Sequence, residues 1–346
     1  MKKFGLVLGM FIVMFGLVAC GESVEELRGM IEDSVIGNLR DENAPVGLGL
    51  VSIHQNWEAF DDSVDWDAFD FDDPAAMPNI PTATPEQMRE IGQLPYVEIF
   101  EYYLTIYAES HAFDYSYSPG WGSFPVPEGE TSWLSLRGTT TAELVFMEKN
   151  MIELISGRSF TESEIAHYSE LNPAIIPSGL AEANGLTVGS TFTVDVIVRY
   201  SEPFDDTPMW EWWQSEESIY EERSFSFEVV GIFDMFVEDP FVATESEPWG
   251  AWGIENQIYL EVGMIHIPYV VAEKIFNYEM DAFNRMMLSL GDDMPAWFVP
   301  SEDTKPLIES LLILSEPADF NAFRQAAMEI LPEFWTIEDI SDLISN

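Results

Sequence analysis

Apolar, β-branched and aromatic residues gather in four stretches that have the length of strands. The stretches are VGLGLVSI (46–53), YVEIFEYYLTIYAES (96–110), TFTVDVIVRY (191–200) and SFSFEVVGIF (224–233). Side chains of these types fit a pleated, half-buried surface. We therefore predict a strand in each stretch.

Apolar residues at helical spacing predict helices over other parts of the chain. The predicted helices are 85–92, 161–171, 177–184, 269–278 and 318–331. The first and third carry proline near their start, where the missing N–H has no helical partner in any case. Residues 24–40 also place apolar side chains on one face and predict an amphipathic stalk. Strands and helices alternate without long βαβ regularity, so the predicted fold class is α+β.

The N-terminus begins with Lys2 and Lys3, followed by an uncharged run from Phe4 to Ala19. This is the basic start and apolar middle of an export signal. The run is short for a membrane span, which needs ~20 apolar residues. Leu-Val-Ala before Cys20 matches a bacterial lipobox, which favours a cleaved lipoprotein with a lipid on Cys20. The alternative is an uncleaved first transmembrane helix, and in both cases the rest of the chain lies outside the cytoplasm.

Cys20 is the single cysteine, so the chain has no intramolecular disulfide and depends on a packed core. A core is plausible because 47% of the residues are hydrophobic and 14% are aromatic. The length of 346 residues leaves room for one large or two ordinary domains after the signal.

Charge is the most unusual property of the composition. There are 14 Lys and Arg residues against 62 Asp and Glu residues, which gives a formal net charge of −48. A surface of that sign repels phosphate backbones, so we expect no nucleic-acid partner. It also offers no basic patch to anionic lipid, which leaves membrane attachment to the N-terminus. We interpret the excess of carboxylates as a solubility adaptation rather than a specific cation site.

Two stretches combine acidic with aromatic residues, WEAFDDSVDWDAFDFDD (57–73) and FDDTPMWEWWQSEESIYEE (204–222). The first fails as a calcium loop, because Phe69 and Asp70 stand where an oxygen ligand and a glycine are required. We predict that both stretches are surface loops with aromatic anchors.

Motifs of catalysis and metal binding are missing from the sequence. His54, His111, His167 and His266 have no spacing that fits a local metal pair, and each is expected to be a surface or half-buried residue. There is no Gly-x-Ser-x-Gly elbow and no phosphate-binding loop. We therefore predict no enzyme activity, no cofactor and no metal ligand.

The middle of the chain carries an ordered set of pieces. They are ELISGRSFTESEI (153–165), with an apolar turn and a Thr161-x-x-Glu164 capping box, NPAIIPSGLAEANGLTVGSTFTV (172–194), FSFEVVGIFD (225–234) and QIYLEVGMIHIPYVVAEKIF (257–276). This order resembles the extracytoplasmic core domain of MacB-type, FtsX-like ABC transporter permeases. Residues 311–339 also look like the last strand, helix and strand of that family.

The resemblance implies a porter-like α/β sandwich with an inserted, mostly β subdomain. The corresponding division is a signal or first transmembrane helix at 1–20, a stalk at 21–45, porter-like parts at 46–184 and 257–346, and the insert at 185–256. Gly157, Arg158, Gly189 and Gly231 fall on family motifs, and we expect structural roles for them, with Arg158 in an ion pair or bonded to a turn.

The resemblance further implies a noncatalytic domain that contacts substrate or a partner and transmits motion driven by a cytoplasmic ATPase, with an ABC permease as partner. The later transmembrane helices of such permeases have no counterpart among the residues up to Asn346. The chain is therefore expected to be a stand-alone lipoprotein or one piece of a permease. The alternative function is an independent solute-binding or accessory lipoprotein.

Overall fold

The fold is α+β, as the sequence predicts, and one large mixed sheet forms its centre. A computed structural model describes residues 49–64, 81–118, 122–126, 130–148, 151–200, 215–235, 262–291 and 305–341. The strands are β1 (Leu50–Gln55), β2 (Val97–Ser110), β3 (Tyr115–Ser118), β4 (Gly122–Pro125), β5 (Ser132–Thr139), β6 (Ile152–Gly157), β7 (Leu171–Pro177), β8 (Thr191–Arg199), β9 (Ile219–Met235), β10 (Ile265–Pro268), β11 (Glu309–Leu314) and β12 (Trp335–Asp339). The helices are α3 (Trp57–Ser63), α4 (Pro85–Gly92), α5 (Val145–Glu148), α6 (Glu162–Ala166), α7 (Ser178–Ala183), α10 (Tyr269–Ser289) and α11 (Phe320–Met328).

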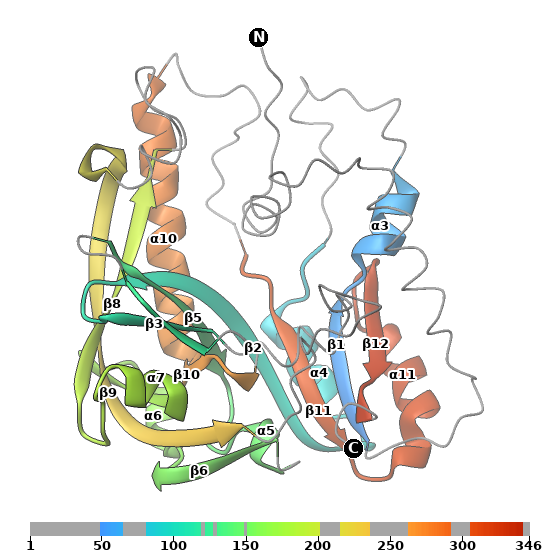
Figure 1. Ribbon diagram of the computed structural model, residues 1–346. Coiled ribbons are helices and arrows are strands. Elements are labelled where there is room, and N and C mark those ends of the chain that lie inside the picture. Colours follow the sequence, from blue (N-terminus) through green and yellow to red (C-terminus); the bar gives the residue numbers. More distant parts are fainter. Residues whose placement is uncertain are drawn as a thin grey trace, which may run out of the picture.

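Ten strands form the large sheet, in the order β12-β1-β11-β2-β5-β10-β7-β9-β6, with β8 paired to both β2 and β9 (Figure 1). The pairs β10·β5 and β7·β9 are parallel, and the others in this sheet are antiparallel. A separate hairpin is made of β3 and β4. The long strand β9 therefore meets three partners, β7 along one edge and β8 and then β6 along the other.

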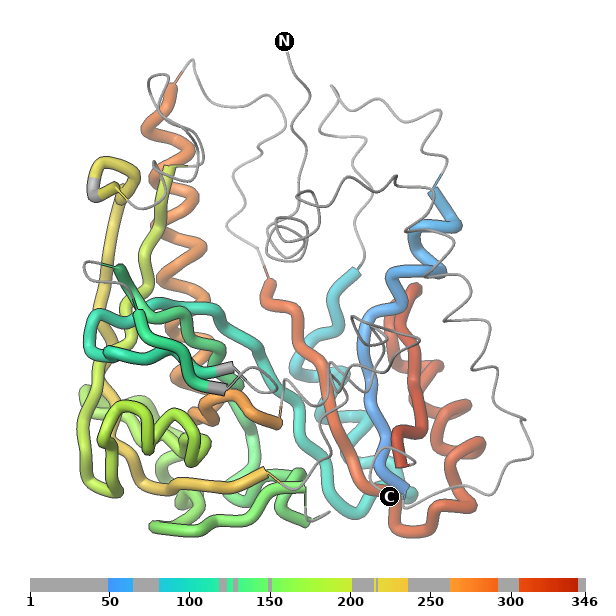
Figure 2. The backbone as a smooth tube through the Cα atoms, in the orientation of Figure 1, coloured from blue at the N-terminus to red at the C-terminus, as the bar shows by residue number. Residues whose placement is uncertain are grey.

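Segments from the two ends of the described chain lie side by side. Strand β1 is hydrogen-bonded on one edge to β11 and on the other to β12, both from the C-terminal part. Figure 2 shows this as a blue strand between two red ones. The predicted order of strand, helix and strand near the C-terminus is confirmed as β11, α11 and β12.

Each face of the sheet carries its own hydrophobic core, because successive side chains of a strand point to opposite faces. In β11, Leu312 and Leu314 belong to the first core, whereas Leu311 and Ile313 belong to the second. The first core is covered by α4, α7, α10 and α11 and the second by α5. Burial on both faces explains why these strands read as nearly continuous apolar runs.

The helix α4 matches its predicted bounds because its start is encoded locally. The Thr84 side chain accepts the Gln87 N–H, and the Gln87 side chain accepts the Thr84 N–H, so a capping box fixes the first turn. Pro85 occupies the first helical position. Met88 and Ile91 then lie in the first core.

Several predicted elements differ from the structure. The helix predicted at 161–171 ends at Ala166, and β7 begins at Leu171, because Leu171–Pro177 pairs with β9 in the sheet. The helix predicted at 269–278 continues to Ser289, since Ala282, Met286 and Met287 extend its buried face. The apolar turn predicted at the start of 153–165 is wrong, because Ile152–Gly157 pairs with β9 as strand β6.

The described parts of the acidic stretches form regular elements in place of the predicted loops. Residues Trp57–Ser63 form α3, because the Asn56 side chain accepts the Ala59 N–H and Phe60 is buried. In the second stretch, β9 already begins at Ile219 and pairs with β8. The remainder of both stretches, 65–73 and 204–214, lies outside the described residues.

The predicted signal, the stalk and Cys20 also lie outside the described residues. Strands β8 and β9, which come from the predicted insert at 185–256, are hydrogen-bonded within the large sheet. The five-part division itself stays a prediction. Among the helices of the described residues, none is both long and apolar enough to cross a membrane.

Candidate functional site

The last residue of β6 and the first residue of β8 lie close together along one edge of β9. We call this place the junction, and it consists of residues 157–158, 188–190 and 229–231. Strand β6 pairs with β9 up to Gly157, which lies opposite Gly231, and β8 pairs with β9 from Thr191, which lies opposite Glu228. Between them, the Arg158 N–H donates to the Val230 carbonyl at 2.9 Å, and the Gly189 N–H donates to the Val229 carbonyl at 2.8 Å. The junction is therefore closed by backbone hydrogen bonds.

Glycine is required at the junction by close backbone approach. A Cβ atom on Gly157 would lie 2.2 Å from the Val230 carbonyl oxygen, and Gly157 also has a left-handed φ of 81°. A Cβ atom on Gly231 would lie 2.6 Å from the Arg158 carbonyl oxygen. Gly189 has a φ of 88° but no atom within 4 Å of such a Cβ position, so it serves turn geometry alone.

Arg158 anchors the turn that leaves the junction. Its guanidinium contacts both carboxylate oxygens of Glu164 at 2.8 Å and also donates to the Ser159 carbonyl. The predicted capping box is present, because Thr161 and Glu164 exchange hydrogen bonds at the start of α6. The hydrogen bonds from Arg158, with those from Thr161, lower the pKa of Glu164 to about 2. Arg158 thus makes both kinds of contact that we expected of it.

The tertiary structure brings the four described residues of the predicted set together at this junction. Gly157, Arg158 and Gly231 are in direct contact, and the Gly189 N–H donates to the carbonyl of Val229, two residues before Gly231 in β9. They come from three segments that are far apart in the chain. Cys20 is not among the described residues.

A buried ion pair lies in the second core, and the sequence analysis did not identify it. Arg137 of β5 donates to Glu101 of β2 at 3.3 Å, and neither residue is exposed to solvent. The other oxygen of Glu101 accepts the Thr141 hydroxyl and the Val145 N–H. The Arg137 guanidinium also lies 3.2 Å from the centre of the Tyr103 ring. The available signal was an arginine within the strand-like run SWLSLRGT.

His266 is buried near this pair, between the rings of Phe146 and Phe233. Burial, and next the positive charge of Arg137, lower the pKa of His266 to about 3. The imidazole is therefore neutral at neutral pH. The expectation of a surface or half-buried side chain is wrong for His266, which is completely buried on β10 between two other strands of the sheet.

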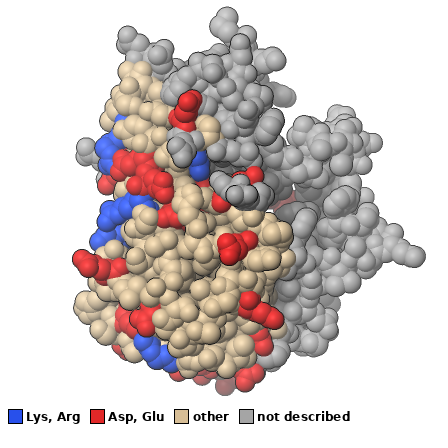
Figure 3. Space-filling view, turned by 60° about the vertical axis from the view of Figure 1, so that its left-hand side comes forward, with Lys and Arg blue, Asp and Glu red and all other residues tan. Residues whose placement is uncertain are grey.

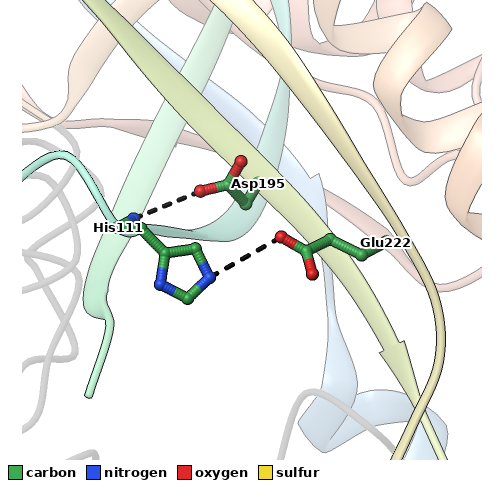
Figure 4. A group of neighbouring side chains, drawn as sticks. All are labelled: His111, Asp195 and Glu222. Atoms are coloured by element: carbon green, nitrogen blue, oxygen red, sulfur yellow. Dashed lines mark hydrogen bonds and ion pairs between the residues drawn. The ribbon is translucent and has the colours of Figure 1, made fainter. Parts of the chain in front are cut away.

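A second polar group lies where the end of β2 meets the middle of β8 and the first part of β9, and Figure 4 shows its three side chains, His111, Asp195 and Glu222. Asp195 is buried, and its oxygens accept the His111 backbone N–H at 3.2 Å and the Ser224 hydroxyl at 2.6 Å. The Nε2 atom of His111 lies 3.6 Å from an oxygen of Glu222. A search for local motif spacing misses this group, because its members come from three different segments.

Charged side chains elsewhere are spread over the surface. On the face in Figure 3, acidic side chains are scattered widely and basic ones lie beside some of them. Arg285, for example, contacts Glu221 at 2.7 Å. Among the described residues, five arginines form ion pairs with glutamates, namely Arg89, Arg137, Arg158, Arg199 and Arg285.

No protein-family model matches the chain, and no curated protein sequence matches it. Three solved structures are similar. The periplasmic region of MacB from Actinobacillus actinomycetemcomitans is 10% identical with a TM-score of 0.40, over 87% of this chain and 92% of that one. The extracellular domain of the ABC-type transporter YknZ from Gram-positive bacteria is 11% identical with a TM-score of 0.38, over 84% and 99%.

The third similar structure is a domain of a permease protein from Porphyromonas gingivalis, which is 11% identical with a TM-score of 0.37, over 87% of this chain and 93% of that one. The first description names MacB, the second an ABC-type transporter and the third a permease protein. Likeness at these scores and identities carries no information about a ligand, a partner or a mechanism.

Proposed function

We propose that this protein is a noncatalytic, membrane-anchored extracytoplasmic domain of an ABC permease system. In this role it contacts a substrate or partner protein and transmits motion that a cytoplasmic ATPase drives. The membrane anchor is the N-terminal segment, through a lipid on Cys20 or through residues 4–19 as a helix.

The observation that supports this proposal best is the junction on β9. The sequence resemblance rests on separate motifs, and three of them supply Gly157 with Arg158, Gly189, and Gly231. These residues meet on β9, where β6 ends and β8 begins. Crowding at Gly157 and Gly231 gives a physical reason for glycine at both positions. A chance match of separate short motifs gives no reason for such a meeting.

Two of the described polar groups, the Glu101–Arg137 pair and Arg158, agree with a noncatalytic role. Glu101 and Arg137 form an ion pair inside the second core, and both side chains are buried away from any substrate. Arg158 is bonded to Glu164 and to a turn. The negative charge of the whole chain suits a solvated domain that holds to the membrane by its N-terminus and not by its surface.

The test is purification of the full chain, tagged at its C-terminus, from membranes of the source cell. We expect an ABC permease and an ATPase subunit to co-purify. Intact mass of the chain with Cys20→Ala, and with Ser23→Ala as matched control, identifies the anchor. A lipidated chain that starts at Cys20 and is lost only in the Cys20→Ala variant supports the lipoprotein form, whereas a chain that starts at Met1 supports a transmembrane helix.

The proposed transmission of motion is tested separately, on the purified complex. Hydrogen exchange of this chain should change when the ATPase binds nucleotide. Recovery without any ABC subunit, together with stabilisation by a small solute in a thermal-shift screen, would contradict the proposal and favour a solute-binding lipoprotein.

A further inference from the structure

Asp195 has an unusual environment for a buried carboxylate. Only 3% of its surface is exposed, and its two oxygens accept hydrogen bonds from the His111 N–H and the Ser224 hydroxyl. Both donors are neutral. Within the part of the chain that the structure describes, no Lys or Arg forms an ion pair with Asp195. Burial of a carboxylate is costly unless a cation or a metal ion compensates it.

Neighbouring Glu109 provides the contrast. It lies opposite Asp195 in the pairing of β2 with β8, and it is buried to a similar degree. Glu109, however, is paired with Arg199 at 3.0 Å. Two carboxylates therefore lie side by side on adjacent strands, and only one has a basic partner among the described residues.

Two further ligand groups stand at the solvent side of Asp195. The imidazole of His111, at the end of β2, and the carboxylate of Glu222, on β9, face each other as Figure 4 shows. One ligand atom from each of the three residues lies within 4.8 Å of the others. His111 and Glu222 are partly exposed, so their side chains can move and an ion can enter.

We propose that His111, Asp195 and Glu222 form a binding site for a divalent transition-metal ion, with Zn²⁺ the best fit. One imidazole nitrogen and two carboxylate oxygens are zinc ligands, and an imidazole disfavours Ca²⁺ and Mg²⁺, which take oxygen ligands. Zinc bonds of ~2.0–2.2 Å place tetrahedral ligand atoms roughly 3.3 Å apart. The present ligand atoms lie within 4.8 Å of one another, so a movement of about 1 Å by the His111 and Glu222 side chains brings them to this distance.

The surroundings support the three ligands. The Ser224 hydroxyl and the His111 N–H hold the Asp195 carboxylate in a fixed orientation, as outer-shell groups do at metal sites. Asp195 and Glu222 are on the paired strands β8 and β9, which gives two ligands a rigid base. A bound ion would tie the end of β2 to this strand pair. The net charge of −48 also raises the local concentration of cations.

The same negative charge requires a test that separates this site from diffuse cation binding. The purified full chain is freed of metal and titrated with Zn²⁺ in competition with a chromophoric chelator, at physiological salt. The variants are His111→Ala and Glu222→Gln. Their matched controls are His167→Ala and Glu217→Gln, which make the same changes at exposed positions outside the group.

The proposal predicts one tightly bound Zn²⁺ per chain and at least about tenfold weaker binding in both site variants. The two controls should bind as the wild type does, and a hundredfold excess of Ca²⁺ should not displace the Zn²⁺. Co²⁺ should give a ligand-field absorption band that His111→Ala removes. Thermal melting without metal checks that the site variants fold. Equal binding by all five proteins, or loss of Zn²⁺ to Ca²⁺, overturns the proposal.

Discussion

Two arginine–glutamate pairs in this protein have the same chemistry and opposite surroundings. Arg137 and Glu101 lie 3.3 Å apart in the second core, and their side chains are 0% and 1% exposed. Arg158 and Glu164 lie 2.8 Å apart beside the β9 junction, and their side chains are 49% and 25% exposed. The shorter contact is therefore at the surface. Distance alone does not rank the two pairs, because water screens the exposed one and has no access to the other.

The buried pair also belongs to a larger network. Glu101 accepts hydrogen bonds from Thr141 and Val145, and Arg137 packs on the Tyr103 ring. Removal of one charge leaves the other buried without compensation. Removal of one charge from the exposed pair leaves the other in water. The difference teaches that the cost of breaking a pair depends on what surrounds the remaining charge.

The largest effect is expected from Glu101→Gln. This change keeps the shape of the side chain but leaves Arg137 as an uncompensated buried cation, so we expect a loss of about 3–5 kcal/mol in the free energy of unfolding. Urea unfolding followed by circular dichroism measures it. Glu90→Gln, at an exposed position on α4, is the control and should change stability by under about 0.5 kcal/mol.

The double variant Glu101→Gln with Arg137→Met sharpens this prediction. It removes both charges, so it should be more stable than Glu101→Gln alone. If Glu101→Gln lowered the free energy of unfolding by less than about 1 kcal/mol, the pair would behave as a solvent-exposed ion pair does, which contradicts the prediction.

The next effect in size is expected at the junction. Gly157→Ala forces alanine into a left-handed φ and places its Cβ 2.2 Å from the Val230 carbonyl oxygen. We therefore expect the free energy of unfolding to fall by about 3 kcal/mol. Gly189→Ala has a similar positive φ but open space around the new Cβ, and should cost about 1 kcal/mol. Thermal unfolding compares the two. Equal losses would show that backbone angle, and not crowding, is what requires glycine at Gly157.

The smallest effect is expected at the exposed pair and depends on pH. The pKa of Glu164 in the folded protein is lowered to about 2 from a usual value of 4.5, chiefly by hydrogen bonds from Arg158. Its stabilising contribution is therefore fully present above pH 4.5 and is lost as the pH falls toward 2. In Glu164→Gln this part of the acid sensitivity disappears, and stability at pH 7 falls by about 1 kcal/mol or less.

Chemical denaturation at several pH values between 2 and 7 tests this comparison. Glu162→Gln, in the first turn of the same helix, is the matched control and should keep the acid sensitivity of the wild type. If Glu164→Gln loses stability between pH 4.5 and 2 as steeply as the wild type does, the pair with Arg158 does not hold the pKa down.

The sequence predicted correctly those elements whose ends are fixed by residues close by in the chain. The helix at Pro85–Gly92 has its cap, its proline and its apolar face within ten residues, and the strand at Thr191–Arg199 is a continuous β-rich run. The helix predicted over 161–171 failed at its far end, because the competing strand β7 gains its hydrogen bonds from β9, more than fifty residues later. The strand at 152–157 was missed for the same reason, since its partner is also β9.

By itself, the sequence determined the α+β class, the acidic character and the identity of the junction residues. These follow from composition, periodicity and short motifs, which depend on neighbours along the chain. Only the tertiary structure decided that Gly157, Gly189 and Gly231 meet on β9, that Arg137 is buried against Glu101, and that His111, Asp195 and Glu222 converge. Arg137 and Glu101 are 36 positions apart in the chain, and Val51 and Asp339, which face each other in the sheet, are 288 positions apart. No local pattern records which strand will become the neighbour of another.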